Sequence, residues 1–204
     1  LWMDTLRMPT YNQSANANFR IAGNRMYTIA TYGNNLNSST AEAVAITKYT
    51  LTGTVLNQIV LSNTGRNFRA KEIYVQPNSS IVATYLTNDA MLNWTVHVHC
   101  YDSNLNQKWH KTFPWPSYST STIPGVGDAL SSFYISYTID SIAGGNYYRK
   151  AFVHKMDSSG NMVWTKNTYD KRYKKLGIDN TGNLVMAGET IAPLVIISNT
   201  IGDV

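Results

Sequence analysis

The chain is poor in the features that mark several common kinds of protein. Its single cysteine, Cys100, excludes an internal disulfide framework and a cysteine-based zinc cluster. It lacks any apolar run of roughly 18 residues, the length that a membrane-spanning helix needs. Only 14% of the 204 residues are charged while 43% are hydrophobic, and this balance excludes a disordered chain. The sequence therefore predicts one folded domain or a small array of repeats.

Helical patterns are also missing. No segment keeps an apolar period of 3.6 residues over about ten positions, whereas residues 95–101 alternate apolar and polar side chains as a strand does. Turn-forming Asp, Asn and Gly residues cluster at 102–104, 157–161 and 179–183. Tyr, Thr, Val and Ile, which favour strands, are abundant. The predicted fold class is all-β.

Three tryptophans stand in similar phrases along the chain. Trp109 and Trp164 lie 55 residues apart, and Trp2 lies 107 residues before Trp109. A degenerate copy without tryptophan fills the gap at residues 55–61. The period of a little over 50 residues is typical of a four-stranded propeller blade. In the second repeat we expect the strands at 70–76, 81–87, 95–101 and 107–113.

The two ends of the chain complete one another. Residues 202–204 followed by residues 1–2 resemble the Gly-Asn-Met-Val-Trp phrase at 160–164. We therefore expect a single β-propeller domain over residues 1–204, whose last blade is closed by the N-terminal strand so that no edge stays open. The alternative is a fragment of a longer array. The four blades are expected at 15–62, 70–113, 125–169 and 173–204 with 1–6.

Residues 151–166 and 176–190 carry two repeat motifs. The first segment reads A-x-x-x-K-x-D-x-x-G-x-x-x-W, and the second reads D-x-x-G-N-x-x-x-x-G-x-T. These phrases resemble the repeat of bacterial secreted β-propellers, with a looser match in the second repeat and a poor one in the first. The resemblance implies a propeller and an extracellular or cell-surface location. It implies no activity, because such repeats serve as scaffolds.

Long connections are expected at one end of the sheets and tight hairpins at the other. Binding residues concentrate in loops that a rigid scaffold holds. Aromatic rings beside amides and carboxylates suit a sugar, and they equally suit a protein partner; Trp115 has the alternative of packing across neighbouring blades. The candidate ligand-binding residues are Asp89, Asn93, Trp94, Trp115, Tyr118, Tyr147 and Tyr148.

Part of the net charge of +5 is concentrated in one region. A basic patch there is suited to an anionic glycan or another anionic polymer, or to membrane headgroups. The alternative is a solvated connection. Nucleic acid is not favoured, because no recognised nucleic-acid-binding module accompanies the patch. The predicted patch comprises Arg149, Lys150, Lys171, Arg172, Lys174 and Lys175.

The histidines do not predict a metal site. His97 and His99 alternate on one strand, but no third ligand is close to them in the sequence, and two ligands make a poor zinc site. We expect a partly exposed strand face there, and His110 and His154 show no evident partners. No nucleophile motif is present, so no catalytic residue and no cofactor are predicted.

The sequence favours a non-enzymatic extracellular binding or adhesion module. Lectin-like carbohydrate recognition on the end with the long connections is the first hypothesis. A structural unit that pairs with other chains in an oligomeric assembly is the second. A propeller-type hydrolase or lyase is the third, since propeller enzymes assemble their sites from distant blades.

Overall fold

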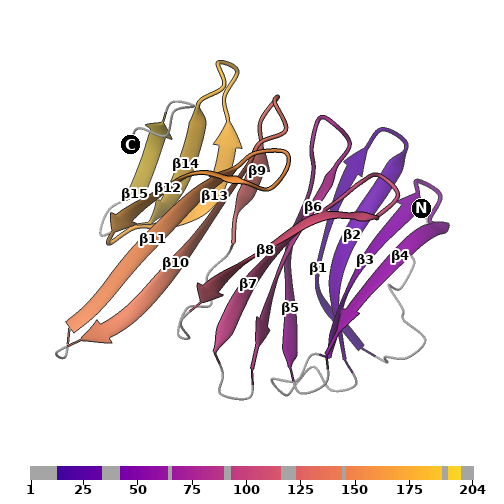
Figure 1. Cartoon of the computed structure of the whole chain (residues 1–204), viewed down its shortest axis with the longest axis horizontal. Coiled ribbons are helices and arrows are strands. Elements are labelled where there is room, and N and C mark those ends of the chain that lie inside the picture. Colours follow the sequence, from indigo (N-terminus) through magenta and orange to yellow (C-terminus); the bar gives the residue numbers. More distant parts are fainter. Residues whose placement is uncertain are drawn as a thin grey trace. The chain divides into compact units, whose positions relative to one another are not determined.

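All the regular secondary structure that the structure describes is β-strand (Figure 1). The structure is a computed structural model. It describes residues 13–33, 42–63, 66–89, 93–115, 123–143, 146–189 and 193–198. In these ranges no helix is present that could serve as a membrane span. The prediction of an all-β chain is confirmed.

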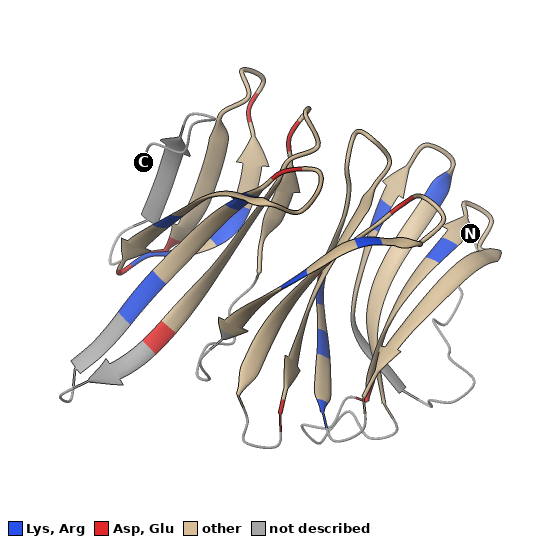
Figure 2. Cartoon of the chain, viewed as in Figure 1, with Lys and Arg blue, Asp and Glu red and all other residues tan. Residues whose placement is uncertain are grey.

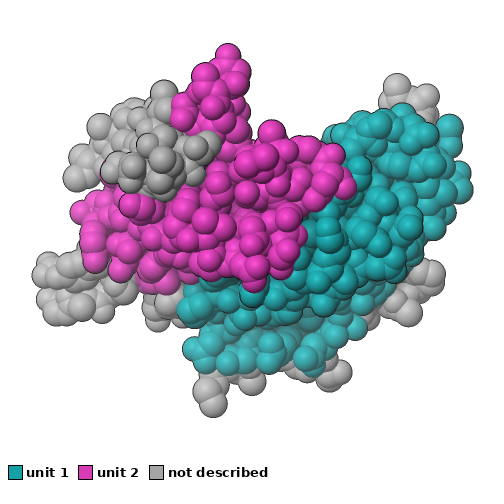
Figure 3. Space-filling view, turned by 45° about the horizontal axis from the view of Figure 1, so that its top comes forward, with its two compact units in different colours: residues 1–75, 79–114 teal, residues 76–78, 115–204 magenta. Residues whose placement is uncertain are grey.

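The chain divides into two compact units, coloured separately in Figure 3. The first comprises residues 1–75 and 79–114, and the second comprises 76–78 and 115–204. Each unit contains two antiparallel sheets in which every strand pairs with the next one along the chain. Each unit has its own main hydrophobic core, and the first unit has a further small cluster of Ala30, Tyr32 and Ala45.

The first unit holds two four-stranded sheets. The first sheet consists of β1 (Gln13–Ala22), β2 (Arg25–Gly33), β3 (Ala43–Thr50) and β4 (Val55–Ser62). The second sheet consists of β5 (Asn67–Val75), β6 (Ile81–Asn88), β7 (Trp94–Tyr101) and β8 (Gln107–Trp115). The four strands expected in the second repeat are therefore confirmed, with ends that differ by a few residues.

The second unit holds a four-stranded and a three-stranded sheet. The third sheet consists of β9 (Gly125–Gly127), β10 (Phe133–Ala143), β11 (Asn146–Met156) and β12 (Met162–Tyr169). The fourth consists of β13 (Arg172–Ile178), β14 (Leu184–Glu189) and β15 (Pro193–Ser198). The expected pairing of residues 1–6 with the last blade lies outside the described residues. The single propeller domain over 1–204 stays a prediction.

One hydrogen-bond pattern recurs at the hairpins. In the β7–β8 turn the Asp102 amide donates to the Asn106 carbonyl at 2.9 Å, and the Asn106 backbone and side-chain amides both donate to the Asp102 carboxylate at 2.9 Å. The turns that begin at Asp157 and Asp179 repeat this pattern. Aspartate suits the position because its carboxylate accepts the turn amides that no strand partner reaches. These bonds lower the pKa of Asp179 to about 2.

Each core lies between the two sheets of its unit. In the first unit β5 packs against β1, β2 and β3. In the second unit β13 packs against β9, β10 and β11. The first core contains Tyr27, Ile29, Val44, Ile46, Phe68, Ala70, Ile73, Ile81, Ala83, Tyr85, Tyr101 and Leu105. The second contains Tyr134, Ala151, Val153, Tyr173, Leu184 and Met186.

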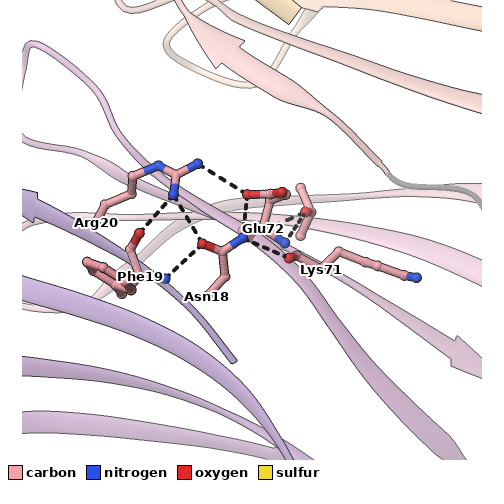
Figure 4. Close-up of polar contacts among 6 residues, drawn as sticks. Asn18, Phe19, Arg20, Lys71 and Glu72 are labelled. Atoms are coloured by element: carbon pink, nitrogen blue, oxygen red, sulfur yellow. Dashed lines mark hydrogen bonds and ion pairs between the residues drawn. The ribbon is translucent and has the colours of Figure 1, made fainter. Parts of the chain in front are cut away.

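A polar contact joins the first two sheets where β1 and β5 both carry a register shift (Figure 4). Arg20 on β1 forms an ion pair with Glu72 on β5 at 3.2 Å. The Asn18 side-chain amide donates to the same carboxylate at 2.7 Å, and the Asn18 oxygen accepts from Arg20 at 3.0 Å. Bulges re-aim side chains that a regular strand would direct elsewhere. Asn18 and Glu72, which flank the register shifts of β1 and β5, both take part in this contact between the two sheets.

Candidate functional site

Three histidines gather on the hairpin formed by β7 and β8. His97 and His99 lie two residues apart on β7 and share one face, because side chains alternate along a strand. The turn at residues 102–106 brings β8 alongside, and β8 contributes His110. One ring nitrogen from each histidine lies within 4.8 Å of those of the other two. We call these three residues the histidine cluster.

His97 connects the cluster to β6. Its Nδ1 lies 3.0 Å from Nε2 of His110, so a proton is shared between two imidazole nitrogens. Its Nε2 lies 2.8 Å from Oγ1 of Thr87. The ring also stacks on Tyr85, with centroids 4.7 Å apart and an interplanar angle of 2°. Both nitrogens of His97 are thus held in a defined orientation.

His99 is the most buried member, with 5% of its surface exposed. Its Nδ1 lies 3.1 Å from Oε1 of Gln107, and its Nε2 lies 3.0 Å from the hydroxyl of Tyr85. Its ring stacks on that of His110 at a centroid distance of 3.8 Å. The expectation of a partly exposed face is wrong for this residue, because both faces of the second sheet contribute buried side chains.

Burial favours the neutral form of the whole cluster. Burial first, and the neighbouring His110 second, lower the pKa of His97 to about 4 and the pKa of His99 to about 3. Burial also lowers the pKa of His110, although this side chain is exposed at the sheet edge. A neutral imidazole keeps the lone pair that a metal ion requires. The cluster therefore offers three neutral nitrogen donors at neutral pH.

The third sheet repeats part of this arrangement. His154 stands on β11 where His99 stands on β7, each three residues before the aspartate of its hairpin turn. Its Nε2 lies 3.2 Å from the Tyr137 hydroxyl, and its Nδ1 lies 2.8 Å from Oγ1 of Thr165. A tyrosine–histidine pair is thus part of the scaffold in both sheets.

Two positions distinguish the histidine cluster from this counterpart. Thr165 takes the place of His110, since each directly follows the recurring tryptophan of its repeat. Phe152 takes the place of His97, since each pairs with the tyrosine of the neighbouring strand. The scaffold therefore accepts a threonine and a phenylalanine at these positions and does not require histidine.

Asp89 and Asn93, two of the predicted ligand-binding residues, hydrogen-bond to each other across the β6–β7 connection. The Asp89 amide donates to the Asn93 carbonyl at 3.1 Å, and the Asn93 backbone and side-chain amides donate to the Asp89 carboxylate at 2.9 and 3.0 Å. This is the pattern of the Asp102 hairpin at the opposite end of the same sheet. The turn alone accounts for these residue types.

Trp94 follows that connection and has a cationic neighbour. The Arg69 guanidinium carbon lies 4.6 Å from the centroid of the indole ring, and Trp94 itself is half-buried. Arg69 was missed by sequence reasoning, because strand pairing alone brings β5 close to the start of β7. We call these two residues the Trp94–Arg69 pair.

The side chains of the other aromatic candidates lie outside the described part of the chain. Trp115 ends β8, and Tyr147 and Tyr148 lie near the start of β11, where the backbone alone is described. Tyr118 lies outside the described residues. These four residues stay predictions.

Acidic residues of β10 and β14 pair with part of the predicted basic patch on β11 and β13, and Figure 2 colours the acidic and basic positions along the ribbon. The Asp140 carboxylate, 3% exposed, accepts from Arg149 at 3.1 Å and from Arg172 at 2.9 Å. Glu189 accepts from Arg172 at 3.2 Å and from Lys174 at 2.6 Å. These residues form an ion-pair network that links β10 and β11 to the fourth sheet.

The other three residues of the patch, Lys150, Lys171 and Lys175, differ in their surroundings. The ammonium of Lys150 lies 5.1 Å from the Phe152 ring centroid and 5.3 Å from that of Tyr169. Lys171 is half-buried and Lys175 is exposed. Because half of the patch is paired with carboxylates, its field is weaker than the sequence alone indicates.

Four of the described carboxylates are held by basic side chains. This applies to Glu72 with Arg20, Asp128 with Lys155, Asp140 with Arg149 and Glu189 with Lys174. A general base needs to reach the proton that it removes, and an ion pair occupies the oxygens that would do so. Among the described residues these carboxylates therefore lend no support to a hydrolase or lyase.

Comparison of the chain with models of protein families found no match, and comparison with curated proteins found none either. Among the residues that the structure describes, the Trp94–Arg69 pair and the histidine cluster are arrangements with a defined chemistry for a ligand.

Proposed function

We propose that the chain is a four-bladed β-propeller that acts outside the cell as a non-enzymatic binding module and recognises carbohydrate. The four sheets of consecutive antiparallel strands support the propeller, since blades are built in this way. The repeat motifs at 151–166 and 176–190 support the same fold and an extracellular setting. The proposed binding face lies at the end of the sheets opposite the tight Asp102 hairpin.

The Trp94–Arg69 pair is the observation that carries this proposal. Trp94 begins β7 at the end of the sheet where the β6–β7 connection lies. The Arg69 guanidinium lies over one face of the indole ring and offers several hydrogen-bond donors in a fixed plane, so the C–H groups of a sugar would stack on the opposite face. A positive charge at this place favours sugars that carry a carboxylate or sulfate group.

A glycan array tests the proposal directly. We expect binding to acidic glycans, and we expect Trp94→Ala to weaken it at least about tenfold, which corresponds to about 1.4 kcal/mol. Phe19→Ala is the matched control, because Phe19 is an aromatic residue of the same unit with 57% of its surface exposed. An array without hits at high protein concentration would refute carbohydrate recognition. Equal weakening by both variants would refute the role of Trp94.

A second function, assembly through strand edges, has a specific observation in its favour. β4 lies at the end of the first sheet. It exposes Val55, Leu56 and Val60 at 52%, 45% and 42%. Exposed apolar side chains on a terminal strand favour addition of a strand from another chain.

Light scattering across a range of protein concentrations tests this second function. If β4 mediates assembly, the wild-type chain associates, and Val60→Lys shifts it to the monomer by placing a charge on the edge strand. Leu130→Lys is the control, because Leu130 is 83% exposed in the β9–β10 turn and not on a terminal strand. A monomer at every concentration would refute assembly.

A further inference from the structure

We propose that the histidine cluster binds one divalent transition-metal ion, with zinc as the first choice. Three imidazole nitrogens suit zinc, copper and nickel, whereas magnesium and calcium prefer oxygen ligands. Three protein ligands with a free fourth position are a common zinc environment. The Trp94–Arg69 pair plays no part in this site, so the two proposals are tested independently.

The distance between two of the donors fits the geometry of such an ion. His97 Nδ1 and His110 Nε2 are 3.0 Å apart. Two zinc–nitrogen bonds of about 2.0–2.1 Å at a tetrahedral angle place their nitrogens about 3.3 Å apart. A zinc ion therefore fits between these two nitrogens after a small opening of the pair, and the proton that they share moves to the other nitrogen of its own ring.

The other nitrogens of the cluster have oxygen partners that orient the rings. Thr87 Oγ1 accepts from His97 Nε2 once Nδ1 is bound to the metal ion. His99 has two hydrogen-bond partners, Gln107 and Tyr85, and metal binding exchanges one of them and retains the other. Such outer hydrogen bonds set the tautomer of a metal-binding histidine and raise its basicity.

The third sheet shows what the scaffold needs without a metal ion. There a histidine, a tyrosine and a threonine satisfy one another, with Phe152 and Thr165 at the positions of His97 and His110. A hydrogen-bonded structural role therefore explains His99 but not the two additional histidines. His110 is exposed, so solvent and a metal ion can reach the cluster from the sheet edge.

Zinc binding to a chain without an affinity tag tests the proposal. The chain is treated with a chelator, titrated with zinc ions by calorimetry, and its bound metal is counted by mass spectrometry. We expect one zinc ion per chain, and we expect His110→Ala to weaken binding at least roughly 100-fold. X-ray absorption at the zinc edge should show imidazole nitrogens at about 2.0–2.1 Å.

Two further variants separate metal binding from folding. His97→Phe copies the residue of the third sheet at the equivalent position, so the chain is expected to fold and to lose zinc affinity. His154→Asn leaves the cluster intact and is expected to bind zinc as the wild type does. Absence of zinc binding by a folded wild-type chain would overturn the proposal. Undiminished binding by His110→Ala and His97→Phe would overturn it equally.

Discussion

Replacing Gly188 by alanine places a methyl group where the backbone of the neighbouring strand already lies. Gly188 on β14 pairs with Tyr173 on β13. An added Cβ would stand 2.0 Å from the carbonyl oxygen of Arg172 and 2.8 Å from Cα of Tyr173. Neither neighbour is the end of a flexible side chain that could rotate away. The two strands therefore have to separate.

The loss of stability in Gly188→Ala follows from how far β13 and β14 have to separate. A Cβ–oxygen contact of at least about 3.0 Å requires the strands to part by about 1 Å, which lengthens a ladder hydrogen bond from about 2.9 Å to beyond bonding range. Losing about two such bonds, at about 0.5–1.5 kcal/mol each, and disturbing the packing of buried Tyr173 lowers the free energy of unfolding by about 3 kcal/mol. The same shift moves Arg172 out of the ion-pair network.

Urea unfolding followed by tryptophan fluorescence measures the effect, with Gly177→Ala as the matched control. Gly177 lies in β13 of the same sheet, and a Cβ added there meets nothing within 4 Å. With a slope of about 2 kcal/mol/M, the Gly188→Ala midpoint should fall by about 1.5 M. Gly177→Ala should leave stability unchanged or raise it by about 0.5 kcal/mol, since alanine loses less backbone entropy. Equal midpoints for the two variants would refute the close approach of β13 and β14.

Two further predictions concern ionised side chains. Asp140→Asn should lower the free energy of unfolding by about 3 kcal/mol in the same urea assay, because two guanidinium groups lose a carboxylate that is 3% exposed; an effect below about 0.5 kcal/mol would refute this role. The pKa of Asp179 is lowered from 3.8 to about 2, so its contribution to stability is complete above about pH 4 and is lost as the pH falls through 2. Unfolding measured from pH 5 to pH 2 should therefore show a shallower decline for Asp179→Asn than for the wild type, and parallel curves would contradict this.

Local sequence signals predicted the strands and turns of the second repeat. Alternation marked β7, and clusters of Asp, Asn and Gly marked the hairpins, because both signals depend on residues a few positions apart. Trp109, one of the recurring tryptophans, is buried at 9% exposure, and Trp164 at the equivalent position is half-buried. These features need no knowledge of how the sheets pack.

The third histidine could not be found by scanning the neighbourhood of His97 and His99. His110 joins them through the pairing of β7 with β8, across a turn. One signal was present nonetheless: aligning the repeats on Trp109 and Trp164 places His110 at the position of Thr165, next to a histidine on the preceding strand. Aligning the repeats and then comparing residues on neighbouring strands would therefore have indicated the histidine cluster.

The net charge of the predicted basic patch could not be read from the sequence for a different reason. Its acidic partners, Asp140 and Glu189, come from β10 and β14, whereas the basic residues come from the end regions of β11 and β13. A charge run in the sequence does not reveal a neutralising residue that arrives from another strand. Local composition therefore cannot show that Arg149, Arg172 and Lys174 are paired with carboxylates.

Within each sheet the strands pair in the order of the chain, and this has a consequence for how the chain folds. Most of these connections span only a few residues, so their first contacts have a small loop-closure cost. Hairpins of this kind form in about 1–10 μs, and chains rich in such local contacts fold faster than those that depend on distant pairings. The sheets can therefore assemble one after another in the order of synthesis, and docking of preformed sheets becomes the slow step.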